Sequence, residues 1–261
     1  MDLHRDVVLK NSPRAFGEYV ATIAHEQESS MEWLGNPAST WTVPPGLQVK
    51  VTEQGHFRPF YGDTVVLPLS AAEIDMVSRR MEILQSRVPD LLAEPLDTTE
   101  LHLTLHDLSN GPDRAALDKA MARNQAHCRD IFRHLGAHFD RHPQDARVEL
   151  VSTRAYPSVA TSAVLGFVPR SDRDFRMLMN MYNLFDDVVY LDYWLRPHVT
   201  LAYFTPMPLD AESRQRLRTA LREADDMGPV TLSFDARALA YQHFVDMNRY
   251  HTLMTVGQPE I

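Results

Sequence analysis

The pattern His-x-Thr-Leu occurs twice in this chain, at residues 102–105 and again at residues 198–201. With 12 His, 16 Thr and 29 Leu among 261 residues, chance would give roughly 0.08 such matches. Both copies lie in short apolar segments that favour β-strands. Because side chains on a strand alternate between its two faces, each copy places its His and Thr together and its Leu in the opposite packing layer. The fold is therefore expected to contain two separate strands that each present an imidazole and a hydroxyl.

Hydrophobic periodicity divides the remaining chain into strands and helices. We expect strands over residues 64–69, 101–105, 148–153, 163–168, 198–204, 230–239 and 250–256. We expect helices over residues 14–26, 70–85, 113–141, 175–185 and 210–225, the third of which Gly136 could interrupt. Ser70 and Glu73 form a capping box at the start of the second helix. This order of elements predicts an α+β fold with antiparallel sheet and helices on the outer faces.

The first part of the chain differs from the rest. Residues 1–54 have weak periodicity and contain Asn36-Pro37 and Pro44-Pro45, which are typical of loops. We interpret residues 1–54 as an N-terminal extension. Residues 55–261, where the periodicity is strong, are expected to form the main domain.

The composition is that of an ordinary globular protein, with 44% hydrophobic and 23% charged residues. The single Cys128 cannot form an intrachain disulfide, which points to a reducing compartment. We find no signal peptide, and the strongest apolar run, residues 163–168, is too short to cross a bilayer. We therefore expect a cytoplasmic protein that does not interact with a membrane.

The formal net charge of −9 limits the partners that the chain can have. Proteins that hold long nucleic acids are usually basic, because contacts to phosphate supply most of the non-specific affinity. Lysine is almost absent and the arginines are scattered. We expect no long nucleic acid as a partner, and an anionic substrate that is small and bound in a locally positive pocket.

Two imidazoles and two hydroxyls suit the cleavage of a phosphodiester without a metal or another cofactor. One neutral imidazole can take a proton from the attacking water, while a protonated imidazole gives one to the departing alkoxide. Both forms are accessible near neutral pH. We therefore predict that His102 and His198 are catalytic. The hydroxyls of Thr104 and Thr200 are predicted to bind the phosphate oxygens.

Two His-x-Thr-x strands about a hundred residues apart resemble the 2H phosphoesterase superfamily, which includes RNA 2′,5′-ligase-like phosphodiesterases and cyclic phosphodiesterases. The chain looks most similar to the bacterial cyclic-phosphodiesterase-like branch, over roughly residues 55–256. The resemblance implies a bilobal, pseudo-twofold-symmetric fold with one motif in each lobe and the active site in a central cleft. It also implies that the four motif residues have the roles given above and that the reaction needs no metal.

Other candidate residues carry weaker signals. Arg58, Arg154 and Arg196 lie in or beside elements that could border the cleft, where any of them could bind substrate, although solvated arginines would look the same. His106 lies four residues after His102, so it is expected on the same face of the strand. A zinc site made of His102, His106 and His198 is therefore conceivable. The second motif has no histidine at the matching position. Asp107 and Tyr203 each lie five residues after the histidine of their motif. Strand alternation therefore predicts that they point away from the cleft.

Several functions remain open. The first is hydrolysis of a small cyclic phosphodiester, such as a nucleoside 2′,3′-cyclic phosphate. The second is a 2′,5′-phosphodiesterase or 3′-exonuclease that acts on RNA ends, which the acidic composition disfavours. The others are a non-catalytic module that binds nucleotides and a metallohydrolase with histidine ligands. Turnover of a cyclic nucleotide in the presence of EDTA would separate the first from the last two.

Overall fold

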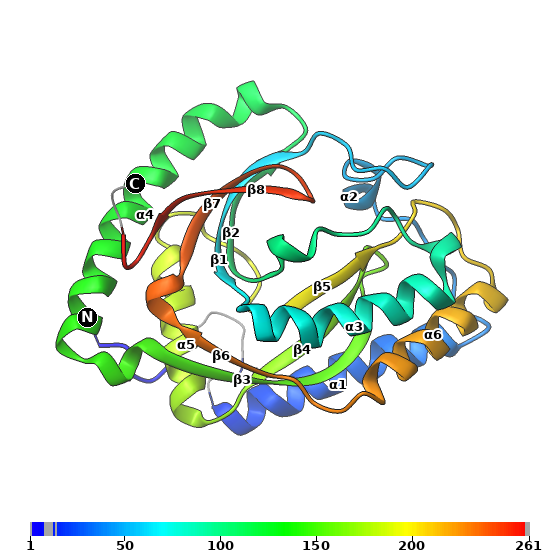
Figure 1. The fold of residues 1–261 in the computed structure, drawn as a ribbon, viewed down its shortest axis with the longest axis horizontal. Helices are drawn as coiled ribbons and strands as arrows, with labels where there is room; N and C mark the ends of the chain where they lie inside the picture. Colours follow the sequence, from blue (N-terminus) through cyan, green and yellow to red (C-terminus); the bar gives the residue numbers. More distant parts are fainter. Residues whose placement is uncertain (1, 8–12, 14, 259–261) are drawn as a thin grey trace.

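The computed structural model describes residues 2–7, 13 and 15–258, and these residues form two four-stranded sheets (Figure 1). The first sheet has the order β2-β1-β7-β8 and the second has the order β5-β4-β3-β6, with antiparallel neighbours throughout. The first sheet consists of β1 (Tyr61–Pro68), β2 (His102–Gly111), β7 (Ala240–Asp246) and β8 (Arg249–Thr255). The second consists of β3 (Arg147–Ser158), β4 (Ser162–Pro169), β5 (His198–Tyr203) and β6 (Thr231–Asp235).

The two strands that carry the tetrapeptides occupy corresponding places. β2 and β5 each form one end of their sheet's strand order. The two strands also contact each other, so the sheets meet along them (Figure 1). Each tetrapeptide begins at the first residue of its strand. This arrangement brings two motifs that are far apart in the sequence to a common boundary between the sheets.

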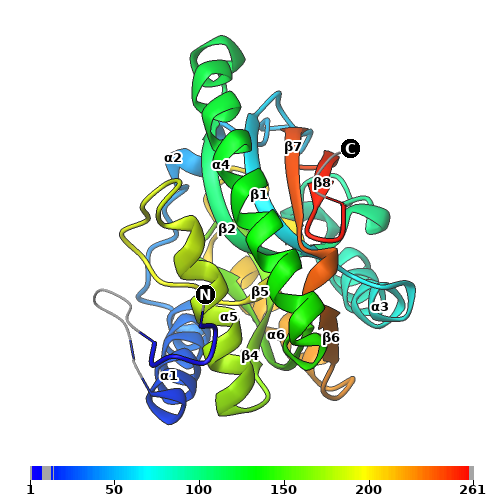
Figure 2. The same ribbon diagram turned by 90° about the vertical axis from the view of Figure 1, so that its left-hand side faces the viewer.

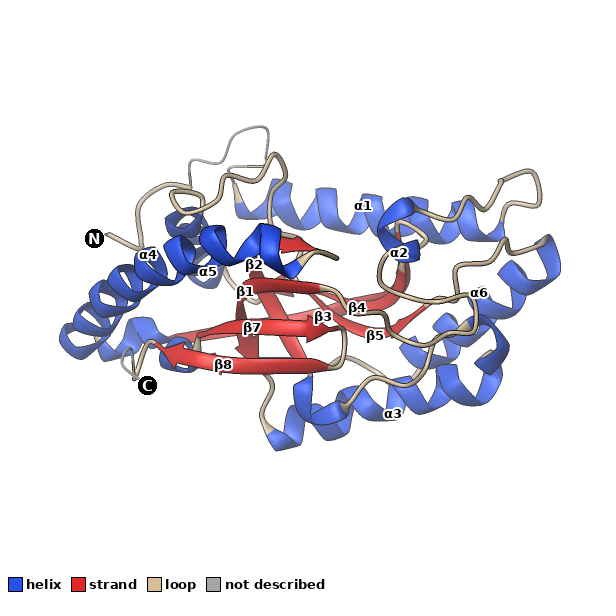
Figure 3. Cartoon of the chain, turned by 90° about the horizontal axis from the view of Figure 1, so that it is seen from above, coloured by secondary structure: helices blue, strands red, loops and turns tan. Residues whose placement is uncertain are grey.

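The helices pack on the outer sides of the sheets (Figures 2 and 3). α4 (Arg114–Arg141) covers β1 and β2 and reaches α5 (Asp172–Phe185), which packs against β3 and β4. α3 (Ala71–Arg87) follows β1 in sequence but packs against α6 (Ala211–Asp225) and β5. The short α2 spans Pro45–Gln48, and 3₁₀ turns span Pro89–Leu91, Thr98–Glu100, Pro143–Ala146 and Ala236–Ala238. The expected α+β fold with antiparallel sheets and outer helices is confirmed.

Local sequence signals explain where several helices begin. The Ser70 amide donates to the carboxylate of Glu73 at 2.7 Å, as expected for the capping box. At the start of α4, the Asp113 carboxylate accepts from the Ala115 amide. At the start of α6, the Asp210 carboxylate accepts from Ser213. Such caps satisfy amides that have no partner within the helix, and so fix its first residue.

The structure corrects several of the elements expected from the sequence. The expected strand over residues 230–239 is β6, followed by a 3₁₀ turn that the Asp235 side chain caps through the Arg237 amide. The next strand, β7, was not predicted, because the buried polar residues Gln242 and Asp246 hide its hydrophobic pattern. α4 is continuous through Gly136, where an added Cβ would lie 3.2 Å from the Val256 carbonyl oxygen, so this glycine allows the chain end after β8 to approach the helix.

The N-terminal segment packs into the same hydrophobic core as the sheets. α1 (Phe16–Gly35) is longer than the helix expected over residues 14–26, and it lies against β3 and α6. Tyr19, Ile23 and Leu34 are buried in the main core. The Tyr19 hydroxyl donates to the Leu195 carbonyl at 3.0 Å, just before β5. α1 therefore supports the segment that leads into the second motif. None of the helices formed by the described residues is long and apolar enough to cross a membrane.

Candidate active site

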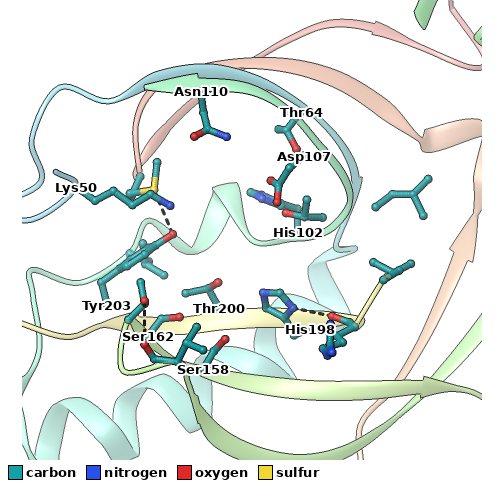
Figure 4. A pocket seen from close by; sticks show the side chains of 18 of the residues that line it. Lys50, Thr64, His102, Asp107, Asn110, Ser158, Ser162, His198, Thr200 and Tyr203 are labelled. Carbon is teal, nitrogen blue, oxygen red and sulfur yellow. Dashed lines mark hydrogen bonds between the residues drawn. The ribbon is translucent and has the colours of Figure 1, made fainter. Parts of the chain in front are cut away.

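A cavity of about 800 Å³ lies where the two sheets meet. All four residues predicted from the tetrapeptides line it, His102 and Thr104 from β2 and His198 and Thr200 from β5. Figure 4 shows the two imidazoles on facing strands, with Thr200 beside His198. Each of the four side chains is half-buried. The fold therefore brings the two motifs together in one cavity that a small molecule could occupy.

Both histidines are oriented by the same hydrogen bond. His102 Nδ1 lies 2.7 Å from the carbonyl oxygen of Glu100, and His198 Nδ1 lies 2.8 Å from that of Arg196. Because a carbonyl oxygen only accepts, Nδ1 carries the proton in each ring. In the neutral ring Nε2 is then the acceptor, and in the charged ring it is a donor. Each imidazole can thus take or give a proton at the same atom.

A β-bulge follows the threonine of each motif. Val66 pairs with Thr104 but Val65 pairs with His106, so Leu105 is an extra residue in β2. In β5 the corresponding extra residue is Leu201. The burial patterns of the two strands agree: the histidine and threonine are partly exposed, and the two residues after the threonine are both buried. A bulge shifts the alternation of side chains by one residue.

This shift reverses the orientation expected for the residues after each motif. Asp107 and Tyr203, which were expected to point away from the cleft, both line the cavity. They occupy equivalent positions, each five residues after its histidine. His106, which was expected on the same strand face as His102, is instead buried, with Nε2 3.1 Å from an Asp186 carboxylate oxygen and its ring 4.8 Å from that of Tyr182.

The position of His106 separates it from the two cavity histidines, so the three do not form one ligand set. In the part of the chain that the structure describes, no three or more His, Cys, Asp or Glu side chains are grouped so as to hold a metal ion.

The electrostatic surroundings of His102 favour its neutral form. Burial lowers the pKa of His102, because the charged ring loses its hydration, and the nearby His198 lowers it further. The hydrogen bond to the Glu100 carbonyl and the charge of Asp107 act in the opposite direction, but the net shift is downward. The ring of Tyr250 packs edge-on against His102, with centroids 4.8 Å apart. His102 is thus suited to accept a proton.

The three candidate arginines differ in position. Arg58 is exposed and bonds the Val51 carbonyl, and Arg154 is paired with Glu28; neither lines the cavity. Arg196 does line the cavity. Its Nε and Nη2 donate to both carboxylate oxygens of Glu26, at 2.6 and 2.9 Å. Its guanidinium carbon also lies 4.2 Å from the centroid of the Trp194 ring. Arg196 is therefore already bound on two sides.

Sequence reasoning missed a cation that lines the cavity. Lys50 comes from the N-terminal segment, between α2 and β1, and its side chain points toward Tyr203 and Asn110 (Figure 4). The only signal in the sequence is rarity, since the chain has just three lysines, Lys10, Lys50 and Lys119. Nothing in the local pattern distinguishes Lys50 from a solvated residue.

Comparisons with known proteins support the fold but not the chemistry. No family model and no curated protein match the chain. A conserved protein of unknown function from Agrobacterium tumefaciens, ATU0111, has a similar structure, with a TM-score of 0.62 and 19% identity over 87% of this chain and 98% of that one. This likeness shows a shared fold.

Two further solved structures are more distant. Usb1 of Kluyveromyces marxianus has a TM-score of 0.37 and 13% identity over 75% of this chain and 98% of its own. LigT of Escherichia coli has a TM-score of 0.35 and 12% identity over 74% of this chain and 95% of its own. At such scores the likeness is partial, and nothing about the activity of this chain follows from it.

Proposed function

We propose that the protein is a metal-independent phosphodiesterase that hydrolyses a small cyclic phosphodiester, such as a nucleoside 2′,3′-cyclic phosphate. The observation that carries this proposal is the convergence of His102 and His198 on one cavity, each held by an identical hydrogen bond at Nδ1. A pair of structural histidines would not need matching orientations, two neighbouring threonines and an open cavity. These features together suit an acid–base pair better than a packing role.

The surroundings of His102 support giving it the role of the base and His198 that of the acid. His102, whose pKa is lowered by burial, takes a proton at Nε2 from the attacking water. The water oxygen forms a bond to phosphorus as the bond to one ribose oxygen breaks. His198, protonated, gives its Nε2 proton to that leaving oxygen, and a phosphomonoester results. Each such catalyst typically contributes on the order of 100- to 10,000-fold.

Thr104 and Thr200 are proposed to bind the phosphate. Each lies two residues after its histidine on the same face of its strand, and both line the cavity. Their hydroxyls can donate to the non-bridging oxygens, which carry the negative charge throughout the reaction. The matching positions on β2 and β5 would place one donor on either side of the phosphorus.

The cavity favours a small substrate. Its volume of about 800 Å³ is in the usual range for small-molecule sites, roughly 300–1,000 Å³. Its wall includes the acidic residues Glu26, Glu100 and Asp107, which would repel a long polyanion. Residues 1–54, interpreted as an extension, contribute Glu26 and Lys50 to the wall. The single, buried Cys128 supports the further proposal of a cytoplasmic location.

The test is turnover of nucleoside 2′,3′-cyclic phosphates in the presence of EDTA. We compare the wild type with His102→Ala, His198→Ala and the control His127→Ala, which changes an exposed histidine on α4. We expect each cavity variant to lose roughly 100-fold or more in kcat and the control to keep wild-type activity. Near-full activity in either cavity variant would disprove the two-histidine mechanism.

Three other outcomes would point to different functions. Tight binding of a cyclic nucleotide without any turnover would indicate a non-catalytic binding module. Preferential release of mononucleotides from the 3′ end of an oligoribonucleotide would indicate an RNA-end activity. Loss of turnover with EDTA would indicate a metal-dependent reaction.

A further inference from the structure

The position of Lys50 is fixed by its backbone neighbours. Leu47 and Val51, on either side of it, are fully buried. The Lys50 carbonyl accepts a hydrogen bond from the Arg58 amide at 2.8 Å, and Val51 forms an isolated bridge with Phe57. The base of the side chain is thus anchored to the protein core, while the half-buried side chain lines the cavity.

The charge of Lys50 is not neutralised by any carboxylate of the residues that the structure describes. Among the described residues, none has a carboxylate oxygen within 4 Å of its ammonium group. Its nearest aromatic neighbours are Phe60 and Tyr203, whose ring centroids lie 5.0 and 5.9 Å from Nζ. Aromatic rings favour a cation but leave its charge in place. Arg196, the other permanent cation that the described residues contribute to the wall, is paired with Glu26.

The surroundings of Lys50 offer further polar groups. Asn110, Ser162 and Tyr203 lie on the same side of the cavity as Lys50, away from the two histidines (Figure 4). The amide of Asn110 and the hydroxyl of Ser162 can donate hydrogen bonds from different directions, which suits a group with three oxygens. The Tyr203 hydroxyl donates to Met247 Sδ at 3.1 Å, and a phosphate oxygen is a stronger acceptor than a thioether sulfur. Lysine commonly binds phosphate as a point charge. This side of the cavity is therefore suited to an anion.

We propose that Lys50 binds a second phosphate, a terminal phosphomonoester, on the same molecule whose cyclic phosphodiester is cleaved between His102 and His198. This inference rests on the proposed function and narrows its substrate class. The substrate would be a small phosphodiester with a phosphate at both ends of a pentose-sized unit.

The spacing along β5 is consistent with such a substrate. Tyr203 lies on the same side of the cavity as Lys50 and is three residues after Thr200. One of the residues between them, Leu201, is the extra residue of the bulge and adds little length to the strand. At a rise of about 3.3 Å per residue, the two side chains lie roughly 7 to 10 Å apart along the strand. A pentose ring with its exocyclic carbon spans a distance of this order. One ligand could therefore reach both the threonines and Lys50.

The test uses two substrates that differ only in the second phosphate: adenosine 2′,3′-cyclic phosphate with and without a 5′-phosphate. For the wild type, we expect kcat/KM to be about tenfold or more higher with the 5′-phosphate, as for other hydrogen bonds to charged groups. In Lys50→Met this ratio should fall to about one. The control Lys119→Met removes the same charge from the exposed face of α4 and should keep the wild-type ratio. Because each ratio is measured within one preparation, partial misfolding does not affect it.

A ratio near one in the wild type, or a ratio that Lys50→Met leaves unchanged, would overturn the inference while the proposed function stands. A loss in Lys50→Met that is equal for both substrates would also overturn it, since Lys50 would then act on the reacting phosphate.

A binding measurement separates the failure of this inference from that of the proposed function. The affinities of adenosine 3′,5′-bisphosphate and adenosine 3′-monophosphate are compared by calorimetry for the same variants. Absence of turnover with both cyclic substrates would disprove the proposed function. Tighter binding of the bisphosphate that depends on Lys50 would then still support the anion site, and equal binding of both nucleotides would overturn it.

Discussion

The hydroxyl of Tyr193 donates a hydrogen bond to Oδ2 of Asp107 at 2.8 Å. Asp107 lies on β2 of the first sheet, whereas Tyr193 belongs to the segment between α5 and β5, beside the second sheet. The Tyr182 hydroxyl holds the same segment through the Tyr193 carbonyl at 2.6 Å. Burial and the Asp107 charge both raise the pKa of Tyr193, so its hydroxyl stays a neutral donor. This contact joins the two halves of the molecule at the wall of the cavity.

The charge of Asp107 leads to a prediction about the pH dependence of activity. A general base must be neutral, and the pKa of His102 is lowered by burial, so we expect the acidic limb of kcat/KM to lie below the ordinary histidine value of about 6.5. Asp107 raises that pKa by its charge. The variant Asp107→Asn should therefore move the acidic limb to still lower pH. The measurement is kcat/KM for a cyclic nucleotide as a function of pH.

The control for this prediction is Asp118→Asn, which removes the same charge from an exposed position on α4. The control should leave the profile unchanged. A limb that stays in place in Asp107→Asn, or moves to higher pH, would contradict the assignment of His102 as the base.

A buried carboxylate behind the first sheet is expected to contribute strongly to stability. Asp63 is 1% exposed and accepts hydrogen bonds from the Ser109 amide at 2.7 Å, the Asn124 side chain at 3.1 Å and the Tyr241 hydroxyl at 2.8 Å. The variant Asp63→Ala removes the carboxylate acceptor from all three donors. The Ser109 amide then has no acceptor in its place, while the Asn124 side chain and the Tyr241 hydroxyl keep the Ser109 hydroxyl and the Met121 carbonyl, at 2.9 and 3.2 Å. We expect the free energy of unfolding in urea to fall by about 3 kcal/mol or more. The exposed Asp118→Ala should change it by less than about 0.5 kcal/mol, and a similarly small loss for Asp63→Ala would refute this role.

The first sheet also requires a glycine at position 62. A Cβ at Gly62 would overlap the backbone oxygen of Ser109 and the ring of Phe244, which lines the cavity. Because the backbone cannot move away easily, Gly62→Ala should lower the free energy of unfolding by about 1–3 kcal/mol. Gly17→Ala in α1 is the matched control, since nothing lies within 4 Å of its added Cβ. The thermal midpoints of both variants test this, and equal midpoints would show that the strand adapts without cost.

Local sequence was sufficient to place many of the elements. Ser70 and Asp210 mark helix starts that the structure has at the same places. These signals succeed because a cap involves only residues close together in the chain. β7 was missed because its place in the fold depends on residues far away in the chain. Its polar residues Gln242 and Asp246 are buried, whereas their polarity alone would predict an exposed segment.

The sequence by itself determined two pairs of side chains that share a strand face, because the alternation of a strand places His102 with Thr104 and His198 with Thr200. Only the tertiary structure decided what surrounds them. The bulges at Leu105 and Leu201 exist relative to β1 and β4, and they bring Asp107 and Tyr203 into the cavity. Lys50 reaches the same cavity from a segment with no motif. Register between strands and the packing of a loop arise from residues distant in sequence, so no local pattern can specify them.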